Sequence, residues 1–171
     1  LKSAAWQQVG GHGAVRTNVL DDVGMAKAVE EAGLRLHMVF MRTLFRCRMY
    51  DSLESLWEGW TKNLFAGMNR SWPTLIGVVG INLVMSVLPY VVLLLGLVGA
   101  LAPVWAWWGG ACVFFIQCQR LYLDAALKNR LVYGVTHALG CVLLTFLLLN
   151  SGLQSVRGTA TWKGRTLPKG A

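Results

Sequence analysis

Residues 71–119 read SWPTLIGVVGINLVMSVLPYVVLLLGLVGALAPVWAWWGGACVFFIQCQ and contain no Asp, Glu, Lys or Arg. A second stretch without these four residue types extends from Leu131 to Val156. A helix needs about 20 apolar residues to cross the roughly 30 Å of hydrocarbon in a bilayer. The first stretch is therefore long enough for two membrane spans and the second for one. We expect spans at about 73–101, 104–123 and 131–150, with a kink at Pro89.

The rest of the composition agrees with a membrane protein. Hydrophobic residues make up 55% of the chain and charged residues only 14%, with a formal net charge of +8. The basic residues flank the apolar stretches, which is typical of segments held on the cytoplasmic side near anionic headgroups. This pattern predicts an integral protein of a bacterial-type inner or plasma membrane and argues against nucleic-acid binding. The flanking cations are Arg42, Arg46, Arg48, Lys62 and Arg70, then Arg120, Lys128 and Arg130, then Arg157, Lys163, Arg165 and Lys169.

The residues before the first apolar stretch divide into a water-facing part and a surface helix. Asp21 and Asp22 precede an apolar pattern that ends at Gly33, which predicts a helix of about three turns. Residues 35–41 alternate in part and predict a short strand. The apolar residues of 51–70 recur every three or four positions, which predicts an amphipathic helix at the membrane interface that begins with a capping box of Asp51 and Glu54. The alternative is an ordinary helix on a soluble core. The recurring residues are Leu53, Leu56, Trp57, Trp60, Leu64 and Met68.

Asp21 and Asp22 are the strongest catalytic candidates in the water-facing part. A carboxylate at a helix start is held by the backbone and can accept a proton from a hydroxyl group. Asp is also common at helix N-termini without any catalytic role. The local sequence leaves both interpretations open. His137, inside the third apolar segment, is a second candidate, since ionisable groups in a membrane are often functional. A neutral histidine bonded to a nearby carbonyl is the alternative there.

Several short motifs follow one another in a recognisable order. GGHGAVR at 10–16, LDDV at 20–23 and AGLRL at 32–36 resemble the C-terminal half of the catalytic domain of family 2 glycosyltransferases. RCRMY at 46–50 and WEGWTKN at 57–63 resemble the segments that follow in its membrane-bound members. TWKGR at 161–165 resembles the ending of members associated with hopanoid and carotenoid synthesis. Together these segments extend over nearly the whole chain.

The resemblance implies a fold and a domain order. Residues 1–50 would be the C-terminal half of an α/β, GT-A-like nucleotide-sugar transferase domain. Residues 51–70 would form the interfacial helix, residues 71–156 an α-helical membrane region with two to three spans, and residues 157–171 a basic tail. The implied activity is an inverting transfer of a sugar from a nucleotide-diphosphate donor to a lipid-like acceptor at the cytoplasmic face.

The resemblance also implies roles for particular residues. Asp22 matches the general base, and Asp21 would orient Asp22 or the acceptor. Trp60 would stack on the acceptor, although it also fits the apolar face of its helix, and Lys62 would face the diphosphate. Processive relatives carry a Gln-x-x-Arg-Trp motif where this chain has residues 59–63, which argues against a polymerase. The substrate-binding set implied by the resemblance is Gly11, His12, Arg48, Trp60, Lys62 and Asn63.

No Asp-x-Asp motif occurs in the sequence. Family members bind the donor and a divalent metal, Mg or Mn, through that motif in an N-terminal half. We therefore expect the chain to be part of a longer enzyme, with roughly 200 more residues upstream. Alone, it is expected to bind neither donor nor metal and to be inactive. The alternative function is that of a non-catalytic multi-pass membrane subunit or a truncated relic of a transferase.

The third apolar segment raises a question of topology. Two spans from a cytoplasmic N-terminal part return residues 120–130 to the cytoplasm, as the distribution of cations favours. A complete third span would then export the basic tail, which the same rule disfavours. Either the segment is re-entrant or the tail is exported. The motif at 162–165 also resembles the gating loop of cellulose-synthase-like relatives, which favours a cytoplasmic tail; a basic interfacial anchor is the alternative.

Overall fold

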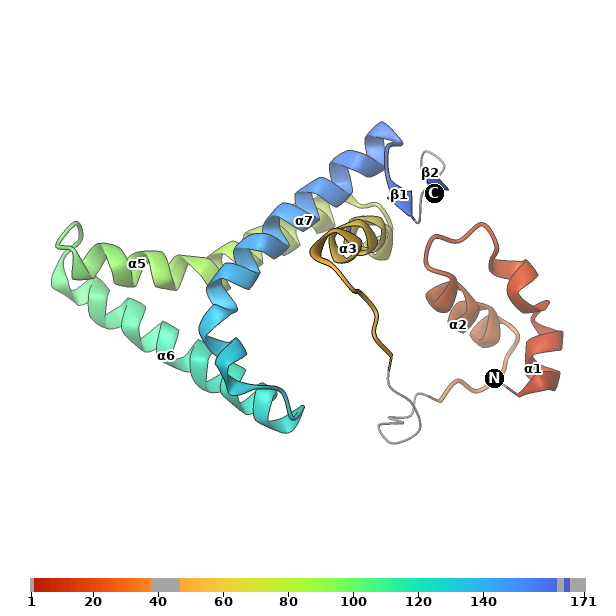
Figure 1. Cartoon of the computed structure of the whole chain (residues 1–171), viewed down its shortest axis with the longest axis horizontal. Coiled ribbons are helices and arrows are strands. Elements are labelled where there is room, and N and C mark those ends of the chain that lie inside the picture. Colours follow the sequence, from red (N-terminus) through yellow and green to blue (C-terminus); the bar gives the residue numbers. More distant parts are fainter. Residues whose placement is uncertain (1, 38–46, 163–164, 167–171) are drawn as a thin grey trace. The chain divides into compact units, whose positions relative to one another are not determined.

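The computed structural model describes residues 2–37, 47–162 and 165–166. Regular structure in these residues is almost entirely helical (Figure 1). Backbone contacts divide the chain into two compact units. The first unit contains Leu1–Arg70 and Asn150–Ala171, and the second contains Ser71–Leu149. The N-terminal part and the C-terminal tail therefore belong to the same unit.

The expectation of an α/β, GT-A-like domain is wrong. The strands among the described residues are β1 (Thr161–Trp162) and β2 (Arg165–Thr166), an antiparallel pair of two residues each. Leu34–His37 have no regular structure, and the remainder of the strand expected at 35–41 lies outside the described residues. A nucleotide-sugar domain needs a largely parallel sheet covered on both faces. The motifs that suggested it are turns and helix starts, which a helical segment can contain equally well.

The first unit begins with α1 (Ser3–Gln8), η1 (Gly11–Val15) and α2 (Asp21–Glu31). The helix predicted at Asp21 is thus confirmed. Gly33 ends it in the left-handed region with φ of +71°, and the N–H of Leu34 donates to the carbonyl of Val29 over 3.1 Å. This backbone reversal favours glycine because a side chain would be strained there.

Helix α3 (Leu53–Gly67) begins with a capping box made by Ser52 and Ser55, not by Asp51 and Glu54. The N–H of Ser55 donates to Ser52 Oγ over 3.1 Å, and the N–H of Ser52 donates to Ser55 Oγ over 3.2 Å. Two hydroxyl groups can exchange these bonds as well as the Ser–Glu pair of the usual motif. The start of the predicted helix is right, and the residues assigned to its cap are wrong.

The buried face of α3 differs from the apolar stripe in the sequence. Its buried residues are Gly59, Thr61 and Phe65, whereas Leu53 is 73% exposed and Trp60 is 43% exposed. The buried side packs on the C-terminal part of α7 (His137–Arg157), where Ser151 contacts the backbone of α3 (Figure 1). Because the face with Gly59, Thr61 and Phe65 is covered, the residues of the predicted apolar stripe are left partly or fully exposed.

The second unit contains a helix that is continuous from Trp72 to Leu97. It consists of α4 (Trp72–Asn82), the π-helical turn η2 (Leu83–Val87) and α5 (Leu88–Leu97). The π turn ends two residues before Pro89, which has no N–H and would clash with the carbonyl four residues earlier. A π turn is one of the ways in which a helix adjusts at such a position.

Two helices among the described residues are long and apolar enough to cross a membrane, Trp72–Leu97 and Leu131–Arg157. The second of these joins η3 (Leu131–Thr136) to α7. A core helix of a soluble protein would be mostly buried, whereas the most apolar windows of these two helices are 0% and 22% buried. The segment expected as the middle span forms α6 (Pro103–Ala126) but is not one of the two. It contains polar residues in its last third, among them Arg120 and Asp124.

Helices α5 and α6 form a tightly packed antiparallel hairpin (Figure 1). A Cβ atom added at Gly96 would lie 2.7 Å from the backbone nitrogen of Ala106, and one added at Gly109 would lie 2.6 Å from that of Leu93. Both distances are too short for real atoms, so the backbones approach as closely as they do because these positions are glycine. Small residues have the same role in helix pairs within membranes.

Candidate functional site

One pocket of the first unit brings together four of the residues expected to bind or react with substrate. It has a volume of about 790 Å³ and lies between the η1–α2 segment, α3 and the tail strand β1. Asp21, Asp22, His12 and Lys62 are the four, and Trp162 joins them from the tail. The full lining is His12, Val15, Arg16, Asn18, Val19, Asp21, Asp22, Met25, Lys62 and Trp162.

Asp21 and Asp22 are the first two residues of α2 and are exposed. Asp22 Oδ1 accepts a hydrogen bond of 2.8 Å from the N–H of Val23, and Asp21 Oδ1 accepts one of 3.2 Å from the N–H of Asp22. Neither Asp forms an ion pair with another of the described residues. Such a carboxylate is accessible to a substrate and can accept a proton from it.

Trp6 contacts His12 and the glycine at the start of η1. The indole N–H of Trp6 donates to His12 Nδ1 over 3.5 Å, and the two rings meet edge to face with centroids 6.1 Å apart. Gly11 has φ of +58° and lies under the Trp6 ring, so an added Cβ would be 2.5 Å from Trp6 Cζ2. Gly11 is buried and does not line the pocket. Its role in the structure is to let Trp6 approach.

Lys62 and Trp162 connect the surface helix to the tail. The Lys62 ammonium lies 4.7 Å from the centroid of the Trp162 ring, within the range of a cation–π interaction. Tyr50 and Trp162 both cover Gly59, where a Cβ would lie 2.6 Å from Tyr50 Cε1 and 3.0 Å from Trp162 Cζ3. Sequence reasoning noted Trp162 only as part of the tail motif. Its distance of 100 positions from Lys62 gave no signal of this contact.

The other expected residues lie outside this pocket. Arg48 pairs with Asp51 over 3.2 Å at the surface, with the two side chains 83% and 82% exposed. Trp60 is exposed on α3. Asn63 is half-buried, and its Oδ1 is buried without a hydrogen-bond partner among the described residues. His137, the first residue of α7, has Nε2 3.6 Å from Cys141 Sγ in the second unit.

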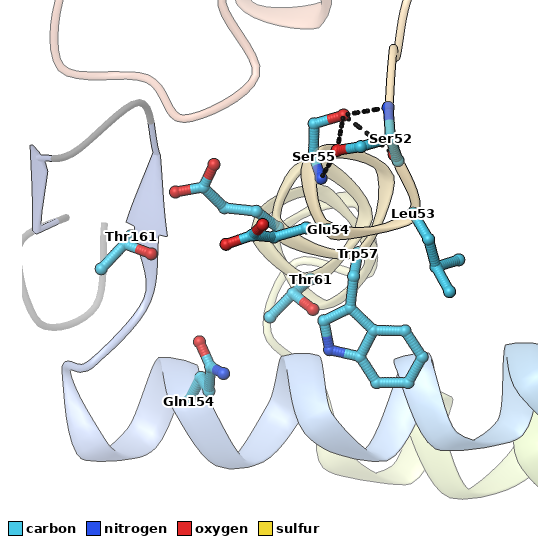
Figure 2. Close-up of a pocket in the computed structure, with 9 residues that line it drawn as sticks. Ser52, Leu53, Glu54, Ser55, Trp57, Thr61, Gln154 and Thr161 are labelled. Atoms are coloured by element: carbon cyan, nitrogen blue, oxygen red, sulfur yellow. Dashed lines mark hydrogen bonds between the residues drawn. The ribbon is translucent and has the colours of Figure 1, made fainter.

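A second pocket, of about 770 Å³, lies where α3, α7 and β1 meet. Figure 2 shows Glu54 and Thr61 of α3, Gln154 of α7 and Thr161 of β1 around it, beside the Ser52–Ser55 cap. None of the residues expected at the site lines this pocket. It has carboxylates but no cation among its lining residues, so it does not suit a phosphorylated substrate.

The described residues contain no group of three or more His, Cys, Asp or Glu side chains placed to hold a metal ion. Comparison of the chain with protein-family models, with curated proteins and with solved structures found no match.

Proposed function

We propose that this chain is the acceptor side of a membrane-bound inverting glycosyltransferase that uses a nucleotide-diphosphate sugar and a lipid-like acceptor. One observation carries the proposal, namely the pocket that unites the Asp21–Asp22 pair with Lys62 and Trp162. Such a transfer requires a general base for the acceptor hydroxyl and a cation for the diphosphate within one accessible pocket. The donor sugar and its divalent metal would be bound by a part with the Asp-x-Asp motif, which this sequence lacks.

The proposed reaction assigns a task to each side chain. Asp22 accepts the proton of the acceptor hydroxyl while the oxygen of that hydroxyl forms a bond to the anomeric carbon of the sugar. The bond from that carbon to the diphosphate breaks on the opposite face, so the configuration inverts. Lys62 stabilises the departing negative charge. Asp21 orients Asp22 or the acceptor, and the Trp162 ring restricts the orientation of Lys62.

The apolar helices support a lipid-like acceptor. An acceptor anchored in the bilayer can meet the base only if the protein holds the base at the membrane surface. The two helices that are long enough to cross a membrane provide that anchorage. Since residues 1–70 and the tail belong to one unit, we propose that both lie on the cytoplasmic face of a bacterial-type inner or plasma membrane.

The test is the Asp22→Asn variant, expressed from its native gene, in native membranes supplied with radiolabelled nucleotide sugars. We expect incorporation of sugar into extractable lipid to fall by about 10²- to 10⁴-fold, the usual contribution of a general base. The matched control is Glu30→Gln, which removes an exposed carboxylate from the same helix outside the pocket. Membrane content of all variants is measured by immunoblot. Near-normal incorporation by Asp22→Asn would reject Asp22 as the base, and none by the unmodified protein would favour a non-catalytic subunit.

A further inference from the structure

A third pocket of the first unit has two cations and no carboxylate among its lining residues. Its volume is about 510 Å³. Asn18 and Lys27 line it from the segment around α2, and Asn69 and Arg70 line it from the turn after α3. Neither Lys27 nor Arg70 forms an ion pair with any of the described residues. The pocket thus has two uncompensated positive charges and two amide groups.

The backbone around the pocket is unusual. Asn69 and Arg70 are consecutive non-glycine residues in the left-handed region, with φ of 51° and 54°. Hydrogen bonds from the N–H of Asn69 to the carbonyl of Ala66 and from that of Arg70 to the carbonyl of Phe65, 3.1 and 3.0 Å long, hold this turn. Glycine adopts this conformation more easily than either residue. The turn therefore presents two long polar side chains at positions where glycine would be the more stable choice.

The side chain of Asn18 occupies space that is open because residue 24 is glycine. It lies against Gly24, and a Cβ at position 24 would collide with Asn18 Nδ2. The ammonium, guanidinium and amide groups that line this pocket are all hydrogen-bond donors. A phosphate group offers several anionic oxygens to such donors, and one Arg guanidinium can donate two parallel hydrogen bonds to it.

The position of Arg70 in the chain indicates where the phosphate comes from. Arg70 is followed by Ser71 and by Trp72, the first residue of a helix that is long and apolar enough to cross a membrane. Trp72 is 38% exposed, and tryptophan favours the headgroup layer of a bilayer. We propose that this pocket binds the phosphate group of an anionic membrane lipid. This inference does not depend on the proposed transferase activity.

The experiment uses the full chain in neutral detergent micelles and native mass spectrometry to measure dissociation constants. The probes are dioleoyl phosphatidylglycerol, dioleoyl phosphatidylcholine and inorganic pyrophosphate. We expect phosphatidylglycerol to bind most tightly, because the choline group would meet two cations. The Lys27→Gln/Arg70→Gln variant should bind it about 25-fold more weakly, at about fivefold for each cation near an anionic lipid.

The control is Lys128→Gln/Arg130→Gln, which removes the same charge beside α6, outside the pocket. It should leave the affinity unchanged, and an equal loss in the two double variants would reduce the effect to diffuse charge and overturn the proposal. Pyrophosphate binding as tight as that of the lipid would overturn the lipid assignment. Gly24→Ala displaces Asn18 without altering charge and should also weaken binding. Affinity unchanged in both Gly24→Ala and the Lys27/Arg70 variant would reject the pocket.

Discussion

At the scale of single residues, the hydroxyl group of Ser151 has an unusual position. It accepts a hydrogen bond of 2.9 Å from the N–H of Phe65 and donates one to the carbonyl of Thr61. These two backbone groups are the donor and acceptor of one turn of α3. Ser151 is buried, and beside it the Asn150 amide donates to Thr61 Oγ1 over 3.0 Å. The contact therefore depends on polar atoms that have no access to water.

We predict that Ser151→Ala destabilises the first unit by about 1–3 kcal/mol, because it removes two buried hydrogen bonds between α7 and the backbone of α3. The measurement is thermal unfolding of the full chain in detergent, together with amide hydrogen exchange at Phe65, which should become faster. Ser155→Ala on the same helix is the control, since no side-chain hydrogen bond of Ser155 occurs among the described residues. Unchanged stability would mean that α3 closes its own backbone hydrogen bond when the hydroxyl is removed.

At the scale of elements, the α5–α6 hairpin is defined by close backbone contact. Gly109 and Gly110 are neighbours in α6, but only Gly109 faces the backbone of Leu93. A Cβ at Gly110 would have Leu93 Cδ1 as its nearest neighbour, at an ordinary 3.8 Å. The two positions therefore separate the effect of packing from that of helix propensity.

We predict that Gly109→Ala destabilises the hairpin by about 1–3 kcal/mol, because the added methyl group forces the helices apart. Gly110→Ala should be neutral or slightly stabilising, since alanine favours a helix by up to about 1 kcal/mol over glycine. Thermal unfolding of both variants in the same detergent is the measurement. Equal effects of the two substitutions would contradict the observed hairpin packing.

At the scale of the whole molecule, the chain consists of two units of different chemical character. The second unit contains all of the first uncharged stretch, and its exposed side chains are mostly apolar. Asn82 is an exception near the middle of the Trp72–Leu97 helix. Its amide donates to the carbonyl of Cys141 and to Thr145 Oγ1, each over 2.9 Å. The amide of Asn82, a polar group in an apolar helix, therefore has hydrogen-bond acceptors on α7 within the same unit.

We predict that Ile81→Lys prevents membrane insertion of the Trp72–Leu97 helix in a large fraction of molecules. Ile81 is 66% exposed, so lysine would cost little in a soluble protein, but it costs about 2.5–3.5 kcal/mol near the centre of a spanning helix. Alkaline extraction of membranes, followed by quantification of retained protein, measures the loss. Val23→Lys, at a residue 45% exposed in α2, is the control. Equal retention of both variants would contradict a span at this position.

Local sequence information was enough for some features. The two uncharged stretches predicted spans at about 73–101, 104–123 and 131–150, because hydrophobicity acts through composition alone. The structure has helices long and apolar enough to cross a membrane at 72–97 and 131–157, and the segment at 104–123 is not one of them. The helix at Asp21 and its end at Gly33 were also predictable, since caps and left-handed glycines are local signals. The resemblance to family 2 glycosyltransferases predicted less of the structure than these local signals did. The α/β fold that it implied is wrong, and the activity that it implied is a proposal.

What the sequence alone determined is therefore the approximate position of two of the three predicted apolar spans, the start and end of α2, and the presence of a helix within residues 51–70. Only the tertiary structure decided which face of α3 is buried, that Trp162 lies over Lys62, and that both line a pocket with Asp21 and Asp22. The physical reason is one of range. Helix formation and helix capping depend on residues a few positions apart, whereas Ser151 and Trp162 contact α3 from about 90 to 100 positions away, and such contacts leave no periodic pattern in the sequence.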